Sequence, residues 1–159
     1  MYYHRYISLF VLEEYSGVVR DTARNLRLLD LCSQFAEEEH DRLVLEQYRP
    51  YLIMMNVRAR ASIAYKNKQY AKALEAIQEG LDQIRAFFRR FGQEQLFARS
   101  NEVRVLRRFA RDIRRKLRVD PVVRLRSQLD KAIKAERYED AARIRDELAA
   151  LRAGKPKRP

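Results

Sequence analysis

The sequence predicts an all-α fold, in which a helical domain is followed by a short antiparallel helical hairpin. The chain of 159 residues has only four Gly and four Pro, whereas the helix formers Leu, Ala, Arg and Glu are abundant. Apolar residues recur at steps of three and four, which is the period of an amphipathic helix. No stretch alternates apolar and polar residues for long, so we expect essentially no sheet. A hydrophobic content of 47% is enough for a packed core.

The first third of the chain is expected to form three helical segments. The first covers about Tyr3 to Glu14, and Ser16-Gly17 is expected to break it, because glycine weakens helices. A second helix runs from near Val18 to Phe35. The acidic run Glu37-Glu38-Glu39 then stands at the front of a third segment, where carboxylates suit the positive end of the helix dipole.

The middle of the chain is expected to form a pair of helices. Pro50 marks a helix start, because proline is tolerated at the first helical position. One helix covers Tyr51 to Lys66 and the next covers Tyr70 to about Arg89, with the polar break Asn67-Lys68-Gln69 between them. Gly92 is placed to end the second helix.

This helix pair, at about residues 51–90, resembles a single tetratricopeptide repeat. The matching small and apolar positions are Ala61, Tyr70, Ala73, Ile77 and Gly80. The repeat's usual early Trp is replaced by Val57, and no second copy is found at an offset of 34 residues. The resemblance therefore supports a helical hairpin rather than a peptide-binding solenoid.

The last third contains the expected domain boundary. Ser100 is expected to cap a helix that runs to about Leu117, and Asp120-Pro121 combines an N-cap with a first-turn proline. We therefore expect a helical domain at 1–119, a hairpin at 120–153 and a disordered basic tail at 154–159.

The expected hairpin has an apolar stripe on each helix and a turn at Ala135-Glu136-Arg137. The stripe of the first helix consists of Val122, Leu125, Leu129, Ala132 and Ile133, and that of the second of Ala141, Ile144, Leu148 and Leu151. Two helices of this length are too small to bury both stripes, so the hairpin needs a neighbour.

The start of the second helix resembles the UVR (UvrB/UvrC) motif, whose core is an aromatic residue followed by Glu, two alanines and an Arg-Asp pair. The matching residues are Tyr138-Glu139-Asp140-Ala141-Ala142-Arg143-Ile144-Arg145-Asp146, with Tyr in place of the commoner Phe. The resemblance covers about Val122 to Leu151. It implies an antiparallel hairpin that pairs with another such hairpin into a small four-helix bundle. The motif joins excision-repair subunits B and C, and it occurs in activators of a protein-arginine kinase linked to Clp proteolysis.

The resemblance also implies which residues meet a partner, either another UVR-containing protein or a second copy of this chain. The implied contact surface consists of Leu125, Leu129, Ile133, Tyr138, Ala141, Ala142, Ile144 and Leu148. The resemblance further implies that Arg145 and Asp146 hold the hairpin or its partner in register. The alternative is that the hairpin packs on the helical domain of its own chain.

The chain carries a net charge of +12, and its arginines concentrate on one helix. Helical spacing places most of Arg104, Arg107, Arg108, Arg111, Arg114, Arg115 and Arg118 on one face, with Asp112 as the one acid of the segment. Such a face suits contact with nucleic-acid phosphates. The alternative is a solvated face that is partly neutralised by Glu37, Glu38, Glu39 and Glu46.

The sequence contains no residue set that predicts catalysis, a metal or a cofactor. Cys32 is the single cysteine, so it can form neither an intramolecular disulfide nor a cysteine zinc site. Glu37 and His40 form one Glu-x-x-His step, but a di-iron bundle needs two. No phosphate-binding loop and no Ser/His/Asp set is found, so neither an enzyme nor a small-molecule substrate is expected.

The chain is expected to be soluble and cytoplasmic. The apolar run Tyr6 to Leu12 ends at Glu13 with no small-residue cleavage site after it, and no segment reaches the ~20 apolar residues of a membrane span. The UVR resemblance implies an adaptor that acts through this hairpin, in DNA repair or the stress response. The alternatives are a nucleic-acid-binding accessory protein and a regulator of the arginine-kinase/Clp system.

Overall fold

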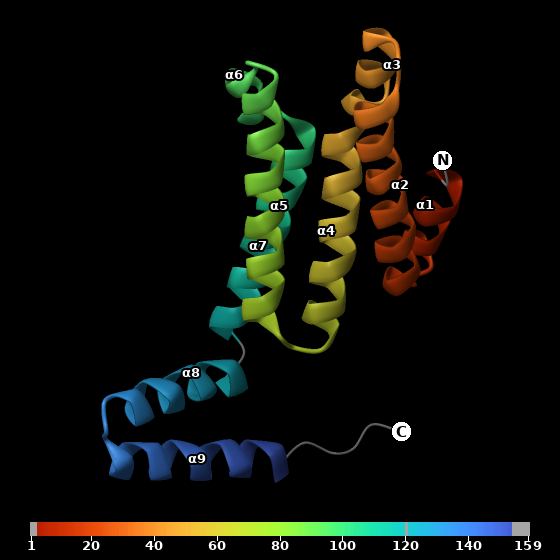
Figure 1. The fold of residues 1–159 in the computed structure, drawn as a ribbon. Coiled ribbons are helices and arrows are strands. Elements are labelled where there is room, and N and C mark those ends of the chain that lie inside the picture. Colours follow the sequence, from red (N-terminus) through yellow and green to blue (C-terminus); the bar gives the residue numbers. More distant parts are fainter. Residues whose placement is uncertain (1–2, 120, 154–159) are drawn as a thin grey trace. The chain divides into compact units, whose positions relative to one another are not determined.

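The computed structural model describes residues 3–119 and 121–153, and within these two ranges it contains helices and no strand. The expected all-α class is therefore confirmed (Figure 1). The tail predicted at 154–159 lies outside the described residues.

Backbone contacts divide the chain into two compact units, residues 1–113 and 114–159, and the division falls within helix α7. The domain limits expected at 1–119, 120–153 and 154–159 stay predictions. The helices that begin in the first unit are α1 (Tyr3–Val11), α2 (Tyr15–Phe35), α3 (Glu39–Val44), the 3-10 turn η1 (Glu46–Tyr48), α4 (Arg49–Lys66), α5 (Tyr70–Arg90), α6 (Glu94–Phe97) and α7 (Asn101–Val119). The second unit contains α8 (Pro121–Lys134) and α9 (Tyr138–Ala153).

The break between the first two helices lies earlier than the sequence predicts. Ser16 and Gly17 belong to the first turn of α2, and the chain instead reverses at Glu13, whose φ is +60°. Gly17 lies against α1, where a Cβ would be 2.9 Å from Leu9 Cδ1, the end of a flexible side chain. The glycine that was expected to break a helix is therefore part of α2 and faces α1.

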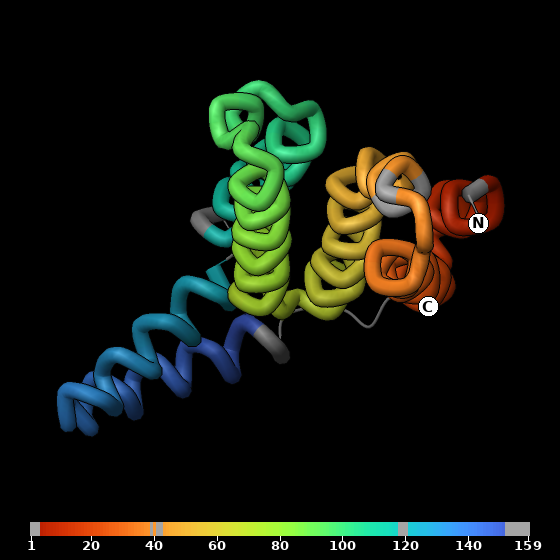
Figure 2. The backbone as a smooth tube through the Cα atoms, turned by 45° about the horizontal axis from the view of Figure 1, so that its top comes forward, coloured from red at the N-terminus to blue at the C-terminus, as the bar shows by residue number. Residues whose placement is uncertain are grey.

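Helix α4 is the centre of the first unit. It packs against both α2 and α5, and both views of the backbone show it between them (Figures 1 and 2). Its buried side chains consequently occur around much of the helix and not on one stripe. They are Pro50, Leu52, Ile53, Met54, Met55, Val57, Ala59 and Ala61.

Helices α4 and α5 approach each other closely at Gly80 and Val57. A Cβ at Gly80 of α5 would overlap the Val57 side chain of α4, so no larger residue fits there without a shift. Ala61, Tyr70, Ala73 and Ile77, which carried the repeat resemblance, are also buried. The helix pair is thus present, and its membership of the tetratricopeptide class stays a resemblance.

Helix α7 covers the same unit with one apolar face. Val103, Leu106 and Ile113 have no exposed surface, and the Phe109 ring lies 6.3 Å from the Tyr65 ring of α4, measured between ring centres. The Ser100 hydroxyl accepts a hydrogen bond from the Val103 amide at 3.4 Å, which confirms the predicted cap.

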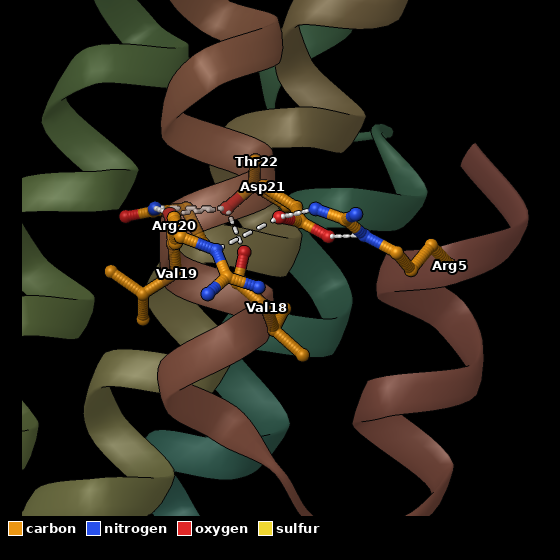
Figure 3. Close-up of polar contacts among 7 residues, drawn as sticks. Arg5, Val18, Val19, Arg20, Asp21 and Thr22 are labelled. Atoms are coloured by element: carbon orange, nitrogen blue, oxygen red, sulfur yellow. Dashed lines mark hydrogen bonds and ion pairs between the residues drawn. The ribbon is translucent and has the colours of Figure 1, made fainter. Parts of the chain in front are cut away.

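Two buried carboxylates join neighbouring elements of the first unit. Asp21 of α2 is only 1% exposed and accepts a hydrogen bond from Arg5 Nε of α1 at 2.6 Å (Figure 3). Glu46 of η1 is likewise buried and forms a bidentate salt bridge with Arg49. The Arg49 guanidinium also donates a hydrogen bond to Asp30 of α2 at 2.7 Å. Hydrogen bonding to Arg5 holds the pKa of Asp21 below its ordinary value of 3.8, because it stabilises the charged form.

Candidate interaction surfaces

The hairpin of the second unit has the turn that the sequence predicts. Helix α8 ends at Lys134 and α9 begins at Tyr138, so Ala135-Glu136-Arg137 connects them. The Arg137 amide bonds the Ala132 carbonyl at 2.9 Å, and Glu136 adopts a left-handed conformation with φ of +56°. These are the marks of a Schellman cap, which reverses the chain at the end of α8.

The first group of predicted contact residues packs between the two helices of the hairpin. Leu125 of α8 and Ala141 and Leu148 of α9 are buried, as is Ala132. Leu129 and Ile144 are half-buried. These apolar side chains are already shielded by the opposite helix, so they hold the hairpin together.

The second group of predicted contact residues remains exposed. Ile133 is 50% exposed and Tyr138 is 68% exposed, one on each side of the turn, and Ala142 follows Tyr138 by one helical turn. At about 100° per residue, Tyr138 and Ala142 project from one face of α9, away from Asp140 and Glu147, and Ile133 projects from α8 away from Gln128 and Lys131. These four polar residues line one groove, so the three apolar residues lie on the other side of the hairpin. This edge, Ile133, Tyr138 and Ala142, is an apolar surface that a neighbour can still bury, and Leu151 further along α9 is also 39% exposed.

Arg145 and Asp146 form an ion pair with each other, and in the described part of the chain neither forms one with α8. Arg145 Nε lies 3.3 Å from Asp146 Oδ1, and both side chains are exposed. Adjacent charges in this position contribute little to stability. Their expected role in register stays a prediction.

The opposite side of the hairpin is a polar groove that the sequence reasoning did not single out. Its polar lining residues are Gln128, Lys131, Arg137, Asp140, Arg143 and Glu147. Asp140 pairs with Arg143 at 3.0 Å and with Arg137 at 3.6 Å. The i,i+3 spacing of these opposite charges was the sequence feature that could have pointed to this groove. The two sides of the hairpin thus differ in chemistry.

The predicted arginine surface lies on α7. The side chains of Arg104, Arg107, Arg108, Arg111, Arg114 and Arg115 are exposed, and that of Arg118 lies outside the described set. Arg104 donates to Asn101 Oδ1 at 3.1 Å, and the Arg107 guanidinium lies 5.5 Å from the centre of the Phe97 ring. In residues 3–119 and 121–153, none of the six forms an ion pair with a carboxylate.

Among the described side chains, no three His, Cys, Asp or Glu residues gather in a way that would hold a metal ion. The helices in the described ranges also include none with the length and apolar character needed to cross a bilayer. Cys32 is a half-buried free thiol.

Comparison with known proteins identifies the hairpin. Residues 121–154 match the model of the UvrB/uvrC motif family, which confirms the resemblance found in the sequence. The matched segment begins with the first residue of α8 and includes all of α9. No curated protein and no solved structure matches the chain.

Proposed function

We propose that this protein is a cytoplasmic, non-enzymatic adaptor whose hairpin binds a second hairpin of the UvrB/uvrC type, in another protein or in a second copy of this chain. The observation that carries the proposal is the family match over residues 121–154, together with the exposed edge formed by Ile133, Tyr138 and Ala142. DNA repair and the stress response are the processes in which we expect it to act.

The division of the hairpin into interior and edge supports this function. Leu125, Ala132, Ala141 and Leu148 stabilise the hairpin from within, so the hairpin can present its edge as a formed surface. An exposed aromatic ring on an apolar edge is typical of an interface, since aromatic residues are enriched there. Packing a second hairpin on this edge makes a four-helix arrangement and buries what two helices leave exposed.

The proposal is tested by placing charge on the edge. The double variant Ile133→Asp and Tyr138→Asp should abolish binding, because the introduced carboxylates would have to be desolvated in the interface. Both positions are at least half exposed, so circular dichroism should show that the helices remain. Self-association is measured by analytical ultracentrifugation, and binding to other UVR proteins by a nuclease-treated pull-down with identification by mass spectrometry.

A matched control introduces the same charge elsewhere on the hairpin. The double variant Ser127→Asp and Ala150→Asp changes two exposed positions that helical periodicity places on the outer backs of α8 and α9. It should bind like the wild type. If the edge variant still self-associates or still captures a UVR protein, the proposed function is wrong, and the same conclusion follows if the wild type does neither.

A further inference from the structure

Helix α7 presents a face made only of arginine. At about 100° per residue, positions 104, 107, 108, 111, 114 and 115 fall within an arc of about 120°. No other residue between 101 and 117 projects into this arc, and Asp112 lies just outside it. With a rise of 1.5 Å per residue, the row from Arg104 to Arg115 is about 16 Å long.

The packing of α7 keeps these arginines on the outside. Val103, Leu106, Ala110 and Ile113 form the opposite face and are buried. A rotation of the helix that turned the guanidinium groups inward would expose this apolar face and desolvate several charges. The arginine face is therefore a permanent feature of the folded protein.

The face also lacks the acidic partners that several other cations of this protein have. Arg5, Arg49, Arg60, Arg85 and Arg89 each pair with a carboxylate. Glu46 is already paired with Arg49. Glu37 and Glu38 are exposed, and in the described part of the chain neither forms an ion pair with an arginine of α7. Like charges at i,i+4 repel by about 0.2–0.5 kcal/mol per pair, so an anion bound along the row would relieve repulsion as well as add attraction.

From this geometry we propose that the α7 face binds the phosphate backbone of a nucleic-acid duplex without regard to base sequence. Guanidinium groups form bidentate hydrogen bonds with phosphate. A row of arginines about 16 Å long can reach phosphates on both sides of a major groove, which is about 12 Å wide. This activity goes beyond the adaptor function, which uses the hairpin edge.

The composition of the face favours nucleic acid over the other polyanions. A protein interface has an apolar core, and a helix that binds a bilayer surface places aromatic or aliphatic residues beside its cations. Within the arc from 104 to 115 every residue is an arginine, so neither is provided. Interfaces with nucleic acid are polar and strongly positive, as this face is.

The test is the salt dependence of binding to a short DNA duplex of random sequence, measured by fluorescence anisotropy between about 50 and 200 mM salt. Wild-type affinity should fall steeply with salt and should be the same for duplexes of unrelated sequence. The triple variant Arg107→Gln, Arg111→Gln and Arg114→Gln should bind more weakly, and the slope of log affinity against log salt should decrease in magnitude by about 2 to 3.

The matched control removes the same charge from other surfaces. The variant Arg27→Gln, Lys72→Gln and Arg126→Gln changes three exposed cations on α2, α5 and α8 that form no ion pair among the described residues. It should keep the wild-type slope. Equal weakening by both triple variants would mean that total charge and not the face binds DNA, and this would overturn the proposal.

Two further measurements address unfolding of the triple variant and binding of other polyanions. If circular dichroism shows that the α7 triple variant is unfolded, the single variant Arg111→Gln replaces it, with an expected decrease in slope of about 1. A polyglutamate peptide and anionic phospholipid vesicles are measured in parallel. Binding of either probe through the α7 arginines, with no binding of duplex, would also overturn the proposal.

Discussion

At the scale of single residues, burial decides whether a charged or apolar side chain contributes to the stability of the fold or to a surface that can bind a partner. Asp21 is held within α2 and bonded to Arg5, whereas Tyr138 of the hairpin lies largely in solvent. The sequence shows both residues as members of helical patterns, with no sign of this difference. Sequence reasoning assigned no role to the Arg5–Asp21 pair, because its members are sixteen residues apart and belong to two helices.

The Arg5–Asp21 pair should make the first unit sensitive to acid. The pKa of Asp21 in the folded state lies below its ordinary value of 3.8, so its stabilising effect is present above about pH 4 and is lost as the pH falls through the folded pKa. Arg5→Ala should cost about 1–2 kcal/mol at neutral pH, less than a fully buried pair, because the Arg5 side chain is 47% exposed. The measurement is urea unfolding at about pH 7 and about pH 3.

The two pH values supply the contrast that checks this cause. Below about pH 3.8 the Asp21 carboxyl takes up a proton more readily in the unfolded chain than in the folded wild type, so its stabilising contribution decreases and the difference between wild type and Arg5→Ala should shrink. Arg20→Ala is the control, because Arg20 contacts Asp21 at a longer distance of 3.3 Å and is more exposed. A cost of Arg5→Ala that is equal at both pH values would show that the lost contribution is packing and not charge.

At the scale of elements, four helices end in the same way although their sequences differ. The amides of Glu14, Gln69, Gln93 and Arg137 each bond the carbonyl five residues earlier, as in a Schellman cap. The left-handed residue that precedes each of these amides is Glu13, Lys68, Gly92 or Glu136. Glycine occupies only one of these four positions, Gly92, and there the sequence predicted the helix end correctly. Glu13 gives no such signal, so the sequence placed the reversal between α1 and α2 wrongly.

The non-glycine caps should carry conformational strain that glycine relieves. A left-handed conformation costs an L residue roughly 1–2 kcal/mol, whereas glycine loses about 0.5–1 kcal/mol more chain entropy on folding. We therefore expect Lys68→Gly to stabilise the first unit by about 0.5–1 kcal/mol, measured by urea unfolding. Gln83→Gly, at an exposed position in the middle of α5, should instead destabilise by about 1 kcal/mol. If both changes destabilise equally, strain at Lys68 is not significant.

At the scale of the whole molecule, the dominant physical feature is the excess of positive charge. The chain has 34 Lys and Arg against 22 Asp and Glu, which gives the net charge of +12. Most ion pairs among the described residues lie on the surface, where each contributes little. Self-repulsion should therefore outweigh pairing at low ionic strength.

This balance predicts that salt stabilises the protein. Raising ionic strength from about 10 mM to about 100 mM shortens the screening length from about 30 Å to about 10 Å and weakens repulsion among the cations. The melting temperature should rise by a few degrees, on the order of 2–4 °C, as measured by differential scanning calorimetry.

The same two triple variants locate the repulsion. The α7 variant Arg107→Gln, Arg111→Gln and Arg114→Gln should melt higher than the wild type at low salt and should respond less to added salt, because it breaks up the row of like charges. The control at Arg27, Lys72 and Arg126 should respond almost as the wild type does. A melting temperature that falls as salt is added would contradict this prediction, since it would mean that screened ion pairs dominate.

The sequence by itself determined the helical class, the turn at Ala135-Glu136-Arg137, the UVR resemblance and the placement of the arginines on one face of a helix. All of these depend on residues within a few turns of one another, so a local sequence pattern is enough to predict them. Only the tertiary structure decided that Leu125 and Leu148 lie inside the hairpin while Ile133 and Tyr138 remain outside, and that Gly17 lies within α2, against α1, and does not break a helix. The physical reason is that burial depends on which helix packs opposite, and a local pattern does not contain that information.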